Sequence, residues 1–237
     1  MSDRSPVEAA DASIHVNRLA VVTEVLPSIA HDLNNCLQVI GGLAEMLVRQ
    51  PTPIGDGGTS KAERIREQAH RAMLLMRDVV AFSRRDDVRR SRVDVRRAVE
   101  RALTFRRYAL SKAAVTVDVD LPPDTVLLAD VDSQWLEQIL VNVILEVERA
   151  LASPEPRRVR VSVVRAGTRI LAQFRYAGAL GRPSPLAGAN LLDPRVEGVG
   201  PTVAAMMAER LRGRLTFLED RDGTTASLEL PASDLAS

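Results

Sequence analysis

The sequence predicts two parts of different fold class: an antiparallel helical hairpin, followed by a mixed α/β sandwich. Apolar residues between Leu19 and Leu47 recur at alternating steps of three and four, which is the spacing of a heptad seam. A stretch rich in proline and glycine at residues 51–58 interrupts this pattern. From about Ser91, short alternating strands are interleaved with amphipathic helices, which is typical of helices packed on one face of one sheet.

The hairpin is expected to occupy residues 13–88, after a polar, disordered tail at residues 1–12. Its first helix should run from Ser13 to Arg49, and its second should begin near Ser60. Each hairpin leaves an apolar face uncovered, so two hairpins should pair as a dimeric four-helix bundle. The seam of the first helix consists of Leu19, Val22, Leu26, Ile29, Leu33, Cys36, Ile40, Leu43 and Leu47.

The second domain is expected to span residues 91–237. Asp132 is placed to cap a helix that ends at Leu151, and Ala166-Gly167 is placed to turn a hairpin. The other expected helices cover residues 95–110 and 203–211. The expected strands cover residues 115–119, 125–128, 158–165, 169–176, 215–218 and 225–230.

Composition excludes several function classes. Thirty-two Lys and Arg residues against 31 Asp and Glu leave a net charge of +1, which argues against a nucleic-acid or membrane-surface binder. The arginine-rich residues 83–107 are interrupted by acids and are interpreted as a solvated linker followed by an amphipathic helix. One cysteine excludes an internal disulfide, and three histidines without metal-ligand spacing predict no metal site. With no apolar run of membrane-spanning length, the chain is expected to be cytoplasmic.

His31 is the most informative single residue, because it lies opposite the seam in the middle of the first helix. Asp32 follows it, and Asn35 lies one helical turn further along on the same side. An exposed imidazole beside a carboxylate can act as a nucleophile whose second ring nitrogen gives up its proton. A solvated surface histidine with polar neighbours is the alternative interpretation.

The run His-Asp-Leu-Asn-Asn-Cys-Leu at residues 31–37 resembles the phospho-acceptor box of two-component sensor histidine kinases. The resemblance implies that His31 carries the phosphoryl group, that Asp32 is the general base and that Asn35 positions water for phosphatase chemistry. The surrounding Ile29, Asn34 and Gln38 would then form the partner-docking surface. The family usually has proline where this chain has Cys36, so the helix should run straighter here.

The second domain resembles the GHKL-type ATP-binding sandwich of the same kinases, but in a degenerate form. Asn142 matches the first asparagine of the family's asparagine box, whereas Glu146 replaces the magnesium-binding asparagine. Tyr176 stands where the family has the aspartate that reads adenine. Gly178 matches a glycine of the next motif, and Leu180 replaces its neighbour.

The second glycine box of the resemblance survives in part. Gly198 and Gly200 are retained before a helix, but the segment between Gly178 and Gly198 is short for an ATP lid. These five positions (Asn142, Glu146, Gly178, Gly198 and Gly200) are therefore interpreted as a vestigial nucleotide site, and ATP is not expected to bind. This pattern is similar to that of histidine phosphotransferases with a degenerate kinase-like domain, the ChpT-like group.

The resemblance therefore implies a histidine phosphotransferase in a two-component phosphorelay, acting through phosphohistidine rather than as an ATP-dependent kinase. Its expected partners are a second copy of itself, response-regulator receiver domains and an upstream hybrid histidine kinase, without nucleic acid or membrane. It needs no cofactor of its own, since the receiver supplies magnesium. Two alternatives stay open: a sensorless kinase or phosphatase with an atypical ATP site, and a non-catalytic scaffold that sequesters a response regulator.

Overall fold

The computed structural model describes residues 6–49, 56–83, 89–121, 125–153, 156–178 and 199–233. The chain divides into two compact units. We call Val25–Arg84 the helical unit, and Met1–Glu24 together with Arg85–Ser237 the sheet unit. The predicted hairpin domain began at residue 13, so its first residues, through Glu24, belong instead to the sheet unit.

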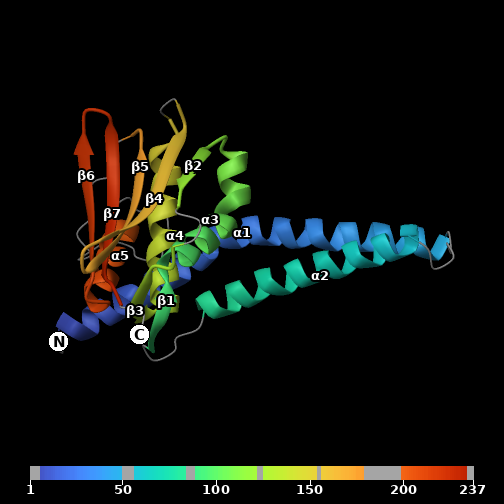
Figure 1. Ribbon diagram of the computed structural model, residues 1–237, viewed down its shortest axis with the longest axis horizontal. Helices are drawn as coiled ribbons and strands as arrows, with labels where there is room; N and C mark the ends of the chain where they lie inside the picture. The colour runs from blue at the N-terminus through green and yellow to red at the C-terminus, as the bar shows by residue number, and fades with distance from the viewer. Residues whose placement is uncertain are drawn as a thin grey trace, which may run out of the picture. The chain divides into compact units, whose positions relative to one another are not determined.

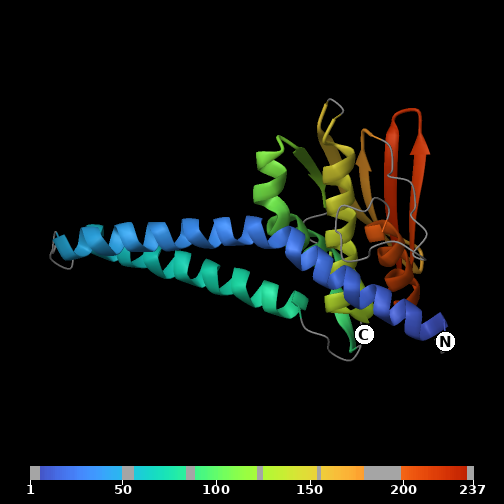
Figure 2. The same cartoon turned by 180° about the vertical axis from the view of Figure 1, so that it is seen from behind.

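Helix α1 (Pro6–Arg49) contributes to both units, and α2 (Asp56–Ser83) completes the helical unit. From Val25 onward, α1 runs alongside α2 in the opposite direction, as predicted for a hairpin (Figures 1 and 2). The prediction of a disordered tail at residues 1–12 is wrong from Pro6 on, because α1 begins there. Proline is favoured at a first helical position, and the following alanines and glutamate are good helix formers.

One proline lies inside α1. Pro27 comes just after the boundary between Glu24 and Val25. Proline has no N–H, so the carbonyl of Thr23 loses its intrahelical donor. The hydroxyl groups of Thr23 and Ser28 donate to the carbonyls of Leu19 and Val25, at 2.9 Å and 2.8 Å.

The apolar seam of the helical unit is only partly covered within one chain. Ile29 and Cys36 are buried, whereas Leu26 is 49% and Met76 is 47% exposed. The helical hairpin is as predicted, and its pairing into a four-helix bundle stays a prediction.

The sheet unit contains a five-stranded sheet in the order β2-β4-β5-β7-β6, and a two-stranded sheet of β1 and β3. Strand β2 pairs parallel to β4, and the other pairs are antiparallel. Helices α3, α4 and α5 lie on one face of the larger sheet (Figures 1 and 2). The elements are β1 (Arg90–Asp94), α3 (Val95–Lys112), β2 (Thr116–Asp120), β3 (Leu128–Asp132), α4 (Ser133–Ala150), β4 (Arg158–Ala166), β5 (Arg169–Tyr176), α5 (Val199–Arg210), β6 (Arg214–Asp220) and β7 (Gly223–Pro231).

Local capping and turn residues explain most of these boundaries. The Asp132 side chain accepts from the backbone N–H groups of Gln134 and Trp135, which caps α4 as predicted. Gly167 turns the β4–β5 hairpin with a φ of 62°. Gly223 begins β7 with a φ of 135°, at a point where a Cβ would lie 2.2 Å from the Tyr176 carbonyl oxygen.

Two features of the sheet unit differ from the sequence expectation. Strand β1 falls in the arginine-rich stretch that was interpreted as a linker, and β3 lies later than the strand expected at residues 125–128. The two strands form a second sheet, so the expectation of a single sheet is wrong. Three of the five β1 residues are exposed, so β1 has little of the alternation that marks a strand in sequence.

Candidate functional site

His31 lies on α1 in the helical unit, and its side chain is 42% exposed. The amide nitrogen of Asn35, one turn further along, is 3.1 Å from His31 Nδ1. A carboxylate oxygen of Asp32 lies 3.9 Å from the same ring nitrogen, and the Asp32 side chain is 15% exposed. The Asn35 amide and the Asp32 carboxylate therefore both lie close to His31 Nδ1. The spacing of four residues on a helix accounts for the contact between His31 and Asn35.

The contact at Nδ1 determines what the other ring nitrogen can do. If the amide nitrogen of Asn35 donates to Nδ1, then Nε2 carries the ring proton and has no lone pair for attack. If the amide is turned over, its oxygen accepts from Nδ1–H, and Nε2 has the lone pair of a nucleophile. In that second tautomer, Asp32 is the nearby base for the Nδ1 proton.

The predicted docking residues around His31 do not share one surface. Asn34 and Gln38 are exposed. Ile29 is 3% exposed, so its prediction as a docking residue is wrong for this chain. It lies two positions before His31, which turns its side chain to the seam side of the helix.

The candidate nucleotide positions in the sheet unit are buried. Asn142, Glu146 and Tyr176 are at most 2% exposed. Gly200 packs on Asn142, since a Cβ added there would lie 3.1 Å from the Asn142 side-chain oxygen. Gly178 has a φ of 121°, which favours glycine. Gly198 and Leu180 lie outside the described residues.

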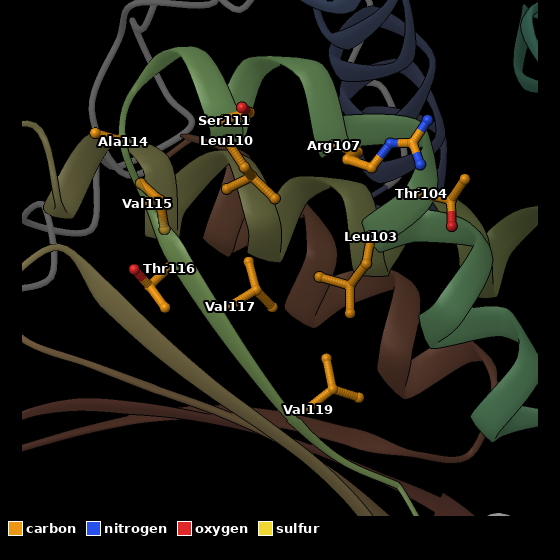
Figure 3. Close-up of a pocket in the computed structure, with 10 residues that line it drawn as sticks. All are labelled: Leu103, Thr104, Arg107, Leu110, Ser111, Ala114, Val115, Thr116, Val117 and Val119. Atoms are coloured by element: carbon orange, nitrogen blue, oxygen red, sulfur yellow. The ribbon is translucent and has the colours of Figure 1, made fainter.

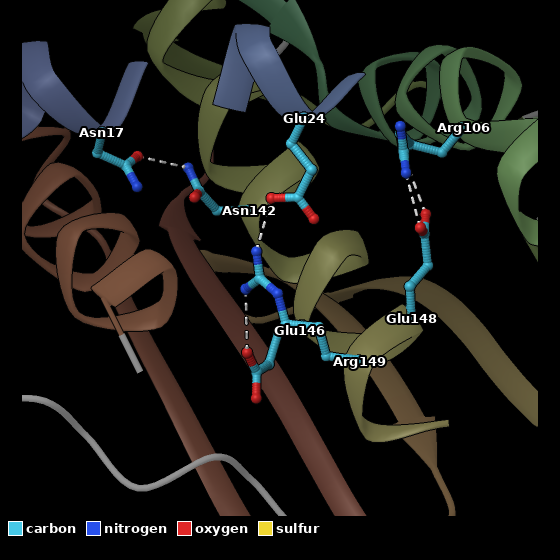
Figure 4. Close-up of polar contacts among 7 residues, drawn as sticks. All are labelled: Asn17, Glu24, Arg106, Asn142, Glu146, Glu148 and Arg149. Carbon is cyan, nitrogen blue, oxygen red and sulfur yellow. Dashed lines mark hydrogen bonds and ion pairs between the residues drawn. The ribbon is translucent and has the colours of Figure 1, made fainter. Parts of the chain in front are cut away.

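Polar contacts within the sheet unit join the first part of α1 to α4 (Figure 4). The amide nitrogen of Asn142 donates to the Asn17 side-chain oxygen at 3.1 Å, and to the backbone carbonyl of Gln138 at 2.9 Å. The Gln138 side-chain oxygen accepts from Arg18 Nε at 3.1 Å. We refer to these bonds, together with the Glu24 pair below, as the α1–α4 contacts.

Two carboxylates share Arg149 in this region. Arg149 donates to Glu24 at 2.8 Å and lies 3.6 Å from Glu146 (Figure 4). Glu24 lies seven residues after Asn17, and Arg149 seven after Asn142, so each pair shares a helix face. Sequence reasoning missed the α1–α4 contacts. Their signal was this matched seven-residue spacing of polar residues on two amphipathic helices.

Burial raises the pKa of two groups here. The pKa of Glu24 is raised from its ordinary 4.5, because burial disfavours the charged form more than Arg149 favours it. The pKa of Tyr176 is also raised, by burial and by the charge of Glu146. The Tyr176 hydroxyl has no hydrogen-bond partner in the described residues. The nearby Thr224 hydroxyl lowers the pKa of Tyr176, against these two effects. Its own proton is donated to the Gly178 carbonyl at 2.7 Å.

The described residues hold no group of three or more His, Cys, Asp and Glu side chains arranged for a metal ion. Among the same residues, no helix combines the length and the apolar character needed to cross a bilayer.

Residues 22–88 match the His Kinase A (phospho-acceptor) domain. Two curated relatives cover most of the chain. Histidine protein kinase DivJ of Caulobacter vibrioides is 30% identical over 87% of this chain and 36% of DivJ. Sporulation kinase B of Bacillus subtilis is 21% identical over 92% of this chain and 52% of that kinase. The chain thus spans about a third to a half of the length of these relatives.

Solved structures show the same fold. Histidine kinase ThkA, in complex with the response regulator protein TrrA, matches 92% of this chain and 64% of its own, with a TM-score of 0.50 and 14% identity. Full-length ShkA in complex with AMPPNP matches 89% of this chain and 47% of its own, also with a TM-score of 0.50 and 14% identity. The sheet unit therefore has an α/β fold that resembles histidine kinase catalytic domains.

Proposed function

The matched phospho-acceptor domain and the histidine kinase relatives support membership of the two-component histidine kinase family, and on that premise we propose a histidine phosphotransferase. His31 exchanges a phosphoryl group with the aspartate of a response-regulator receiver domain, and the receiver supplies magnesium. ThkA was solved with a response regulator, which supports a receiver as the kind of partner. An upstream hybrid histidine kinase is the proposed source of the phosphoryl group.

The observation that carries this proposal is the convergence of Asn35 and Asp32 on Nδ1 of an exposed His31. In the proposed step, the Nε2 lone pair attacks the phosphorus of the receiver's aspartyl phosphate. The Nε2–P bond forms, the P–O bond to the aspartate breaks, and the Nδ1 proton passes to Asp32. Asn34 and Gln38, both exposed, supply the docking surface.

A carrier without its own kinase activity is favoured by the vestigial nucleotide positions. Asn142 already bonds to Asn17 and Gln138, and Glu146 faces Arg149. The buried phenol of Tyr176 stands where the resemblance expects an adenine-reading carboxylate. An ATP molecule would have to displace these contacts before it could bind.

A histidine kinase is the second candidate. DivJ is a histidine protein kinase, and Asn142 and Gly200 match nucleotide-site residues of that family. Incubation with ATP and magnesium, without any partner protein, tests this candidate. Label on His31 would reassign the chain to the kinases, whereas the proposal expects none.

Phosphoryl transfer is tested directly with a phosphorylated receiver domain. Wild-type protein should become labelled, and His31→Ala should not, because the substitution removes the ring nitrogen that accepts the phosphoryl group. His70→Ala is the matched control, since His70 is an exposed histidine on α2 and should be labelled like wild type. Equal labelling of wild type and His31→Ala would contradict the proposal and favour the scaffold alternative.

Substitutions of Asp32 and Asn35, the two neighbours of His31, should affect different reactions. Asp32→Asn should slow transfer by about 10²-fold, the size of a general-base contribution. Asn35→Ala should spare transfer and slow any dephosphorylation of the receiver, because the amide then no longer positions water. Single-turnover transfer rates and receiver dephosphorylation rates measure the two effects. A loss of transfer in Asn35→Ala equal to that in Asp32→Asn would contradict this division.

A further inference from the structure

Strand β2 is one end of the five-stranded sheet, and its second edge carries no strand in the described part of the chain. The Thr116 N–H donates to the Arg157 carbonyl, and the parallel register continues through Asp118 and Asp120. Successive residues of a strand direct their backbone groups to opposite edges. The N–H and C=O groups of Val117 and Val119 therefore point away from β4, to the open edge.

A groove of about 470 Å³ lies beside this edge, between β2 and α3, and its lining is mainly apolar but includes Arg107. Leu103 and Leu110 of α3, and Val117 and Val119 of β2, point into it (Figure 3). Val119 is 52% exposed, although its neighbour Val117 packs on the core. An extended segment added along β2 would pair with the backbone of Val117 and Val119. Every second side chain of that segment would enter the groove.

The opposite face of β2 is acidic. Asp118 and Asp120 project there, because side chains alternate along a strand. On its other edge, β2 pairs with β4, in which arginine and valine alternate. Arg158 of β4 forms an ion pair with Asp118 at 3.4 Å. Asp120 faces Ser162 in the register, and no ion pair of Asp120 occurs among the described residues.

We propose that the open edge of β2 binds an extended segment of a partner protein in which aliphatic residues alternate with lysine or arginine. The aliphatic side chains fill the groove, and the basic side chains face Asp118 and Asp120. Opposite charges on adjacent strands stabilise pairing, and like charges oppose it. A second β2 would bring aspartates against aspartates, so the same edge of another copy is the wrong occupant. The proposal does not depend on His31 or on phosphoryl transfer.

The test uses the full chain and a fluorescent peptide with the sequence of residues 158–164, Arg-Val-Arg-Val-Ser-Val-Val. Anisotropy should report saturable binding that weakens with added salt. Amide hydrogen exchange should slow at Val117 and Val119 when the peptide is present, because their N–H groups acquire acceptors. A peptide with both arginines replaced by glutamate should bind at least tenfold more weakly.

Single substitutions distinguish the contribution of the groove to peptide binding from the contribution of the charges. Val119→Asp should weaken binding more than tenfold, because it removes an apolar contact while keeping the attraction for a basic peptide. Asp120→Asn should weaken binding a few-fold and reduce its salt dependence. Leu218→Asp is the matched control: Leu218 is 67% exposed on β6, the strand at the other end of the sheet, and its replacement should leave binding unchanged.

Three results would overturn the proposal. The first is no saturable binding up to about 1 mM peptide. The second is equal binding of the basic and the acidic peptides. The third is equal weakening by Leu218→Asp and Val119→Asp. Each concerns the sheet unit alone, so none bears on whether His31 accepts a phosphoryl group.

Discussion

Tyr176 places a hydroxyl group in the core of the sheet unit, where no partner among the described residues binds it. Tyr176→Phe keeps the ring and removes this unsatisfied polar group, whose burial costs about 1–3 kcal/mol. We expect the variant to be more stable than wild type, by up to that amount. The midpoint of urea denaturation at pH 7 measures the change. A clear loss of stability would mean that the hydroxyl has a partner.

Glu24 gives the protein a pH-dependent stability of known sign. Its pKa is raised by burial, so the folded chain holds this proton more tightly than the unfolded chain. The contribution of Glu24 to the free energy of unfolding is therefore fully present below the pKa of the unfolded chain. It is lost as pH rises through the higher pKa of the folded chain. We expect unfolding free energies measured from pH 4 to 7 to contain this decline in wild type and to lack it in Glu24→Gln. Identical pH profiles of the two proteins would contradict the prediction.

Sequence spacing predicted the residues that interact within one helix and missed those that interact between helices. His31 and Asn35 lie together because residues four apart are neighbours on one helix face. Asn17 and Asn142 are far apart in sequence, and the matched seven-residue spacing on their helices does not by itself show that the two helices pack together. Ile29 failed as a docking residue because a seam position and a surface position exclude each other.

The α1–α4 contacts should be energetically coupled. In Asn17→Ala, one N–H of the buried Asn142 amide loses its acceptor, so we expect a cost of about 1–3 kcal/mol. Asn142→Ala in the Asn17→Ala background should cost less than Asn142→Ala alone, with a coupling of about 0.5–3 kcal/mol. Denaturation of the four proteins of this cycle measures the coupling.

Thr23→Ala is the comparison for that cycle. Thr23 is exposed, and its hydroxyl bonds only within its own helix, so its change should stay within about 0.5 kcal/mol. Strict additivity of the two asparagine changes would mean that the bond between Asn17 and Asn142 contributes nothing.

The elements that sequence predicted well are those with local signals. Helix α4 has its cap at Asp132, and the β4–β5 hairpin has its turn at Gly167. Strand β1 was missed because it pairs only with β3, far along the chain, and has little alternation of its own. The amino-acid composition of this segment, which is rich in arginine, does not predict such a pairing.

Apolar surface on the helical unit predicts a dimer. Leu26, Leu37, Met73 and Met76 are large apolar residues of α1 and α2, and each is between 47% and 63% exposed. A second hairpin would cover such surface, as in a four-helix bundle. We expect light scattering to give twice the monomer mass at micromolar concentration. Leu26→Glu with Met76→Glu should shift it to one chain, and a stable wild-type monomer would contradict the prediction.

Helix α1 belongs to both units, and Pro27 interrupts its hydrogen bonding just past their boundary. If a ligand beside His31 preferred one conformation of α1 at Pro27, it would alter the free energy of the contacts made by Asn17 and Glu24. Thermodynamic linkage makes this influence reciprocal. In that case, breaking the contacts of Asn17 and Glu24 would change the affinity at His31 by the same factor.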